Sequence, residues 1–230
     1  AYVGDNATLI LTGALQITAN DTATAEPTST VVTVAGLLTL GLTDVQATVD
    51  SDTSATIGDG ATVTATNVRL LADGTYTADA SADSAGGSLV ASISSLNANA
   101  VDTGSVNIRI GAAAGGSATS VTTTAGGIDA DADLLSTVTS ESEGLNFSLV
   151  SAGDIATSAD NDSSVTGHLG DNVSVNVQNG DFDFLLNLDG VSRGLATVAA
   201  GGAVAVAMSE TDVHFDPSAN LTVGTGGKIN

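Results

Sequence analysis

A short aliphatic–Gly–Asp turn recurs along this chain at intervals of about 54 residues, and this long, regular period constrains the fold more than any other feature. The tripeptide at residues 3–5 returns at 57–59 and at 169–171. The glycines of the turn and its looser copies are Gly4, Gly58, Gly111, Gly170 and Gly224, so the step from Gly111 to Gly170 is the longest. A fixed period of this size is typical of stacked repeat architectures, in which one unit alone cannot bury its apolar face.

Apolar and polar residues alternate over many short segments, which is the pattern of β-strands with one buried face. In residues 129–133, Ala130 and Ala132 stand between aspartates, and residues 173–178 and 181–186 alternate Val or Phe with mainly polar residues. Thr and Val are common, and their branched side chains favour the pleated surface of a sheet. No window sustains a helical period, so the sequence predicts an all-β protein.

Glycine pairs punctuate these segments and are predicted to be turns, because glycine adopts positive φ without steric cost. With turns this frequent, one unit of about 54 residues is interpreted as two coils of about 27 residues, the scale of a parallel β-helix. The sequence thus predicts a parallel β-solenoid with roughly two coils per repeat, wound right-handed as parallel crossovers are. The extra residues of the longest step are predicted to form a loop near residues 140–144 or 160–164.

The whole chain, residues 1–230, is predicted to be one continuous solenoid segment. Its repeats span approximately residues 1–54, 55–107, 108–166 and 167–220, with the start of a fifth at 221–230. No capping helix is evident at either end, and open strand edges are normally capped or paired. We therefore expect neighbouring repeats or further copies of the chain to stack on this segment, end to end or laterally.

Residues 35–40 and 203–208 are apolar at successive positions, so both faces of these two strands would be apolar. One interpretation is a strand whose second face is covered by a loop. The other is a contact surface for another copy or another module. The sequence leaves both interpretations open.

The charge is strongly acidic, with 26 acidic residues against 4 basic ones and a formal net charge of −22. Such a surface repels nucleic acid and anionic membranes, so neither is an expected partner. No stretch approaches the roughly 18 continuous apolar residues of a membrane span, and we expect no membrane insertion. The chain contains no Cys, which excludes disulfide and thiol chemistry.

Three aspartates, Asp129, Asp131 and Asp133, occupy alternate positions, so a strand would place their carboxylates on one face. Calcium takes six to eight oxygen ligands, which carboxylate-rich surfaces can supply. We therefore treat these three residues as a candidate site for weak Ca²⁺ binding. The competing interpretation is a solvated outward face, because neither the Gly-rich calcium nonapeptide nor an EF-hand loop is present.

The aspartates of the repeated turn, Asp5, Asp59 and Asp171, recur in phase. An aspartate in a turn can accept a hydrogen bond from the backbone two residues on, so we expect them to stabilise the turn rather than to bind metal. The two histidines, His168 and His214, are far apart in sequence, and surface or turn positions are favoured over metal ligation.

No catalytic or cofactor-binding cluster is evident. Parallel β-helices include polysaccharide lyases and glycosidases, and a carbohydrate-active enzyme of either kind is the alternative function. A lyase needs a basic group, whereas the chain offers only Arg69, Arg109, Arg193 and Lys228, far apart in sequence. A glycosidase needs two carboxylates at a fixed separation, which abundant aspartates do not exclude. Aromatic residues, which form sugar platforms, make up only 3% of the chain.

The segments AYVGDNATL, ATIGDGATVTATNVRLLA and VGTGGKIN resemble the repeat regions of large bacterial β-helical adhesins, the filamentous-haemagglutinin-like and leukotoxin-like exoproteins. The resemblance covers the whole chain at the level of pattern and supplies no site residue. It implies a secreted or surface-anchored stalk, fibre or filament that holds a binding tip away from the cell, with a host or matrix glycan as a possible ligand. The leading prediction is thus a non-catalytic, extracellular structural or adhesive repeat module.

Overall fold

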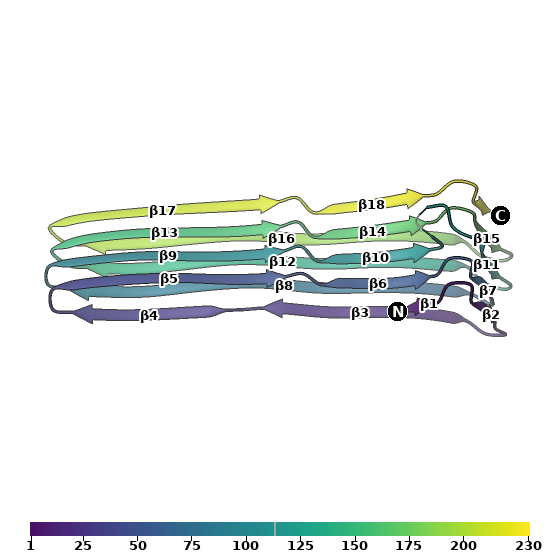
Figure 1. Ribbon diagram of the computed structural model, residues 1–230, viewed down its shortest axis with the longest axis horizontal. Helices are drawn as coiled ribbons and strands as arrows, with labels where there is room; N and C mark the ends of the chain where they lie inside the picture. The colour runs from purple at the N-terminus through teal and green to yellow at the C-terminus, as the bar shows by residue number, and fades with distance from the viewer. Residues whose placement is uncertain (113) are drawn as a thin grey trace.

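The computed structural model describes residues 1–112 and 114–230, and these residues form β-strands and turns without any helix. The strands belong to four parallel sheets, which we name A to D (Figure 1). Sheet A contains β1 (Tyr2–Val3), β6 (Asp52–Ile57), β10 (Ser105–Ile110), β14 (Ser164–Leu169) and β18 (Ser218–Val223). Sheet B contains β2 (Thr8–Ile10), β7 (Thr62–Ala65), β11 (Thr119–Thr123), β15 (Val173–Val177) and β19 (Lys228–Ile229).

Sheets C and D contain the long strands. Sheet C contains β3 (Leu15–Ala25), β4 (Thr28–Ala35), β8 (Val68–Ser88), β12 (Ile128–Phe147) and β16 (Phe182–Gly201), with β3 and β4 both pairing with β8. Sheet D contains β5 (Leu38–Val49), β9 (Ala91–Asp102), β13 (Val150–Asn161) and β17 (Val204–Phe215). The all-β, parallel architecture predicted from the period-two alternation is therefore confirmed.

Each coil is a flattened loop of two facing layers. The chain runs the length of the molecule in sheet C, turns, and returns through sheet D and then sheet A, which lie end to end (Figure 1). Sheet D packs against sheet C at one end of the coil, and sheet A packs against sheet C at the other. The short strands of sheet B close the coil beyond sheet A.

The prediction of two coils per repeat is wrong, because one repeat makes one coil. Ser105 pairs with Asp52 of the preceding repeat and with Ser164 of the following repeat, and no strand of its own repeat lies between them. The 20-residue strands of sheet C need an equally long return path before the chain can pair with itself. The stack of coils is therefore roughly 20 Å thick at about 4.8 Å per strand, half of what two coils per repeat would give.

The surplus residues of the longest step also lie elsewhere than predicted. Ile110 at the end of β10 pairs with Ile57 at the end of β6, and Ser120 of β11 pairs with Thr62 of β7. The connection from β10 to β11 is therefore longer than the connection from β6 to β7, and it holds most of the surplus. This connection includes residue 113, which lies outside the described residues. Residues 140–144, by contrast, belong to β12, where strand pairing is uninterrupted.

The core is a set of stacked rows of small and branched side chains between the two layers. Ala130 and Ala132 are fully buried, as the alternation in this segment predicted. Tyr76 is the largest fully buried side chain, and its hydroxyl donates to the backbone carbonyl of Ser105 at 3.1 Å and lies 2.9 Å from the hydroxyl oxygen of Thr53. The narrow interior explains why a chain with 3% aromatic residues can still fill its core.

The repeated turn needs glycine because turns of successive coils stack backbone on backbone. A Cβ at Gly58 would lie 2.8 Å from the backbone nitrogen of Asp5, and a Cβ at Gly224 would lie 2.6 Å from that of Asp171. Asp5 and Asp171 link successive coils, whereas Oδ1 of Asp59 is buried without a hydrogen-bond partner among the described residues, so the prediction that each bonds within its own turn is wrong. Asp5 Oδ1 accepts a hydrogen bond from the backbone N–H of Asp59 at 2.9 Å, and Asp171 Oδ1 accepts one from the N–H of Thr225 at 2.7 Å.

Candidate functional site: an uncharged apolar tip

The end of the molecule where sheet C turns into sheet D carries no charged residue in any of the four coils. The segments that pass through this end are residues 27–43, 84–101, 144–153 and 194–209, and none contains Asp, Glu, Lys or Arg. All 26 acidic and 4 basic residues lie outside these segments. In Figure 1 this end lies on the left, opposite the two marked chain termini. Charge is thus segregated along the long axis.

On the outward face of sheet D, the two rows nearest the turn are apolar through all four strands. Strand pairing aligns Leu38 with Ala91, Val150 and Val204 in the first row, and Leu40 with Ile93, Ala152 and Val206 in the second. Leu38 and Leu40 are each 61% exposed, so no loop among the described residues covers them. The interpretation of residues 35–40 and 203–208 as strands covered by a loop is therefore wrong.

The outward face of sheet C is also apolar at this end. Val32 aligns with Ala85, Leu145 and Ala199, and Val34 aligns with Gly87, Phe147 and Gly201. Leu37, Leu89 and Leu149 are exposed in the connecting turns. Apolar side chains therefore cover three sides of this end, and we call this surface the apolar tip. It consists of the four aligned rows and these three turn leucines. Exposed apolar surfaces of this extent mark interaction sites.

The three predicted calcium ligands lie on the outward face of sheet C. Asp129, Asp131 and Asp133 project from β12, while the intervening alanines are buried. Strand pairing adds a residue that the sequence analysis missed, because Asp73 of β8 aligns with Asp133. Partial burial first, and then the negative charge of Asp133, raise the pKa of both Asp73 and Asp131, while nearby Arg69 lowers it. The cluster is self-repelling, and calcium binding to it remains a prediction.

The structure brings one histidine to acidic residues that the sequence analysis had not connected with it. His214 of β17 aligns with Asp160 of β13, and its Nε2 lies 3.4 Å from Oδ1 of Asp162. One ligand atom from each of the three residues lies within 4.8 Å of the others, which is compatible with holding a metal ion. His214 follows Asp160 by one full period of the repeat, and this is the signal that would have found the pair. His168 instead lies with Nε2 3.3 Å from the carbonyl oxygen of Ala112.

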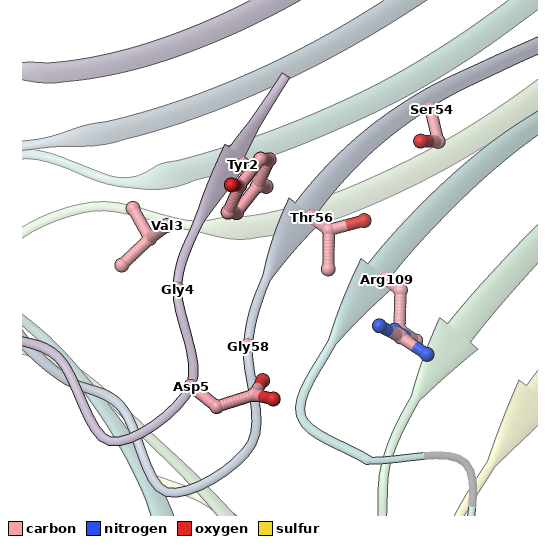
Figure 2. Close-up of a pocket in the computed structure, with 8 residues that line it drawn as sticks. All are labelled: Tyr2, Val3, Gly4, Asp5, Ser54, Thr56, Gly58 and Arg109. Atoms are coloured by element: carbon pink, nitrogen blue, oxygen red, sulfur yellow. The ribbon is translucent and has the colours of Figure 1, made fainter.

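The four basic residues do not converge on one place. Arg193 lies 3.8 Å from Glu141 on sheet C, whereas Arg109 projects from sheet A. Arg109 lines a surface pocket of about 320 Å³ with Tyr2, Ser54 and Asp5 among its other residues. Figure 2 shows that these side chains come from β1, β6, β10 and the turn after β1, on the N-terminal side of the stack.

No protein-family model, no curated protein and no solved structure matches this chain. The described residues also include no helix that is long and apolar enough to cross a membrane. The parallel all-β fold is consistent with the β-helical architecture that the sequence resemblance implies. The resemblance to the adhesins is supported by the sequence pattern alone.

Proposed function

We propose that this chain is a non-catalytic structural module of an extracellular bacterial stalk, fibre or filament, in which further coils pair with its open edges. These coils come from neighbouring repeats or from another copy of the chain. We include in this proposal the right-handed winding that parallel crossovers favour. The main observation in its support concerns Gly4, the first glycine of the repeated turn, which lacks the close backbone contact that the later copies make.

Gly4 has no steric reason to be glycine within this chain. A Cβ added at any of three counterparts, Gly58, Gly170 or Gly224, would lie within 2.8 Å of a backbone atom of the preceding coil. A Cβ added at Gly4 would meet only a ring atom of Tyr2, at 4.0 Å. Its φ is not in the left-handed region either. A further coil stacked beneath β1 would give Gly4 the same requirement as its counterparts.

The opposite edge supports the same conclusion, because inward-facing core side chains of the last coil are exposed there. Val213 and Phe215 of β17 occupy the inward positions that Ala159 and Asn161 fill in β13. Both inward side chains of β13 are buried, yet Val213 is 45% and Phe215 50% exposed. An open core of this kind, on strands with one unpaired edge, is a template for pairing with another strand.

Matched glycine substitutions test the proposal. Gly58→Ala should lower the unfolding free energy of the chain by about 1–3 kcal/mol, because the new methyl group overpacks a close backbone contact. Gly4→Ala should leave the stability of the isolated chain unchanged but weaken the concentration-dependent association seen by sedimentation velocity. Circular dichroism melting measures the first effect.

Two outcomes would overturn the proposal. One is that Gly4→Ala and Gly58→Ala destabilise the monomer equally, since Gly4 would then be required within the chain. The other is turnover of a uronate polymer or a neutral glycan in an activity screen, which would favour the enzymatic alternative over a structural module.

A further inference from the structure

We propose that the apolar tip is a self-association surface, and that two copies of this chain meet tip to tip. This inference goes beyond the edge pairing proposed above, because the tip lies at the end of the long axis and the open edges lie on the two sides of the stack. The two contacts involve different residues and can be tested separately.

The distribution of charge favours a second copy as the occupant of the tip. The acidic residues nearest the tip are Asp83 and Glu143 on sheet C and Asp154 on sheet D, each in the third row from the turn. The distance from the first row to the third is about 13 Å along a strand. Tip-to-tip contact therefore keeps the nearest acidic rows of two copies roughly 26 Å apart, about three Debye lengths at physiological ionic strength.

Contact through the outward faces of the body would be opposed by charge. Each chain carries a formal charge of −22, so contact through the outward face of sheet C would place Asp129, Asp131 and Asp133 against a second acidic surface. Like charges in close contact are destabilising and suppress such pairings. The tip is the large apolar surface on which two chains of this charge can approach with little repulsion.

The composition of the tip disfavours the two other occupants. A basic protein would be attracted to the acidic body, and the tip offers it no carboxylate. A lipid surface is normally held by Lys, Arg and Trp or Tyr at the interface. The four uncharged segments that form the tip contain neither Lys, Arg, Trp nor Tyr. An aliphatic surface that lacks Lys, Arg, Trp and Tyr is best matched by another aliphatic surface, such as the tip of a second copy.

The size of the tip is sufficient for a weak but specific contact. A large apolar side chain contributes about 60–120 Å² of buried apolar area. The large apolar side chains of the tip are between 38% and 84% exposed. Together, over the three sides, they offer roughly 450–900 Å², and an end-on contact covers only part of this area, less than the approximately 800 Å² that each partner contributes to a standard interface. We expect a dimer in the range of transient complexes.

The test compares two substitutions that differ only in place. Leu40→Glu adds a charge to the tip, and Leu135→Glu adds the same charge at an outward position in the body of sheet C, where Leu135 is 44% exposed. Because both leucines face outward and are exposed, neither substitution removes core packing. Circular dichroism melting checks that both variants fold. Sedimentation velocity over a series of chain concentrations, at low and high NaCl, measures association.

We expect the wild-type chain to dimerise more strongly as NaCl is raised, because salt screens the repulsion between the acidic bodies. Leu40→Glu should weaken the dimer at least tenfold, whereas Leu135→Glu should change it less than twofold. Both leucine substitutions are also made in the Gly4→Ala background, in which edge pairing is weakened, and Leu40→Glu should cause the same loss of association there. An equal loss in both leucine variants, or a wild-type chain that is monomeric at every concentration and salt, would overturn the inference. Flotation with phosphatidylcholine vesicles that Leu40→Glu abolishes would identify a lipid surface as the occupant instead.

Discussion

Replacing Asp102 with Asn should stabilise this protein at neutral pH, because it removes a buried charge while the amide oxygen still accepts from the N–H of Gly104 and the amide nitrogen can donate to the hydroxyl oxygen of Ser136. Asp102 is the last residue of β9 and is 0% exposed. Its Oδ1 accepts a hydrogen bond from the backbone N–H of Gly104 at 2.8 Å, and its Oδ2 accepts one from the hydroxyl of Ser136. Burial raises the pKa of the Asp102 carboxyl, although both hydrogen bonds lower it in part.

The next coil shows that Asn fits this position. Asn161 aligns with Asp102, is also fully buried, and accepts a hydrogen bond from the N–H of Ser163 at 3.2 Å. Its Nδ2 has no partner among the described residues, because Gly190 stands where Ser136 lies beside Asp102, so the amide at position 102 has a hydroxyl oxygen to donate to that Asn161 lacks. Since the amide carries no charge, Asp102→Asn avoids the desolvation of a carboxylate. We expect the unfolding free energy to rise by about 1–3 kcal/mol at pH 7, the cost of burying an incompletely compensated polar group.

The pH dependence identifies the cause. The folded-state pKa of Asp102 is raised above its unfolded value, so the folded chain binds the proton more tightly than the unfolded chain. The wild type is therefore penalised at neutral pH, and the penalty falls as the pH drops through the raised pKa. The stability difference between variant and wild type should be largest at pH 7 and shrink on acidification.

Urea denaturation of both proteins between pH 7 and pH 4 measures this difference. Asp102→Ala serves as the control, because it removes the charge but leaves Gly104 and Ser136 without their acceptor, and it should be less stable than Asp102→Asn by about 1–3 kcal/mol. The reasoning is refuted if Asp102→Asn is less stable than the wild type at pH 7, or if its advantage grows as the pH falls.

Calcium should raise the melting temperature more than NaCl of equal ionic strength, because a divalent ion bridges carboxylates on adjacent coils about 4.8 Å apart. Asp133→Asn should reduce this effect, and identical midpoints in calcium, chelator and NaCl would leave Asp129, Asp131 and Asp133 as solvated surface. Ile108→Ala should lower the unfolding free energy by about 2–5 kcal/mol, since Ile108 is fully buried and its loss leaves a cavity in a narrow core. Thr75→Ala, at an exposed outward position of β8, should change it by less than about 0.5 kcal/mol in the same urea titration, and equal losses would contradict the assigned faces.

The alternation in the sequence was sufficient to assign the buried and exposed faces of the strands, because successive side chains of a strand point to opposite sides of the sheet. Ala130 and Ala132 were predicted to point inward and Asp129 to point outward, and the structure agrees. The repeated glycine likewise predicted a stacked architecture, since the same backbone contact recurs wherever one coil lies on the next. The uncharged segments that meet at the tip are also visible in the sequence, although their convergence is not.

The number of coils per repeat was decided by tertiary structure. The period of the repeat is the same whether the chain circles once or twice within it, and alternation of faces says nothing about where a strand ends. For this reason the turn predicted at the glycine pair 86–87 is wrong, because both glycines belong to the last residues of the 21-residue strand β8. The length of β8 is set by pairing with β12, which lies one full coil further along the chain.

The partners of individual side chains were decided in the same way. Asp73 meets Asp133, and His214 meets Asp160, only because successive coils are in register. A sequence supplies the residues of such clusters, but the offset that joins them depends on the exact length of each coil, and that length differs from one coil to the next. Local physical chemistry thus determined which side of each strand is buried, whereas the closed path of the coil determined which strands, and therefore which charges and apolar rows, lie side by side.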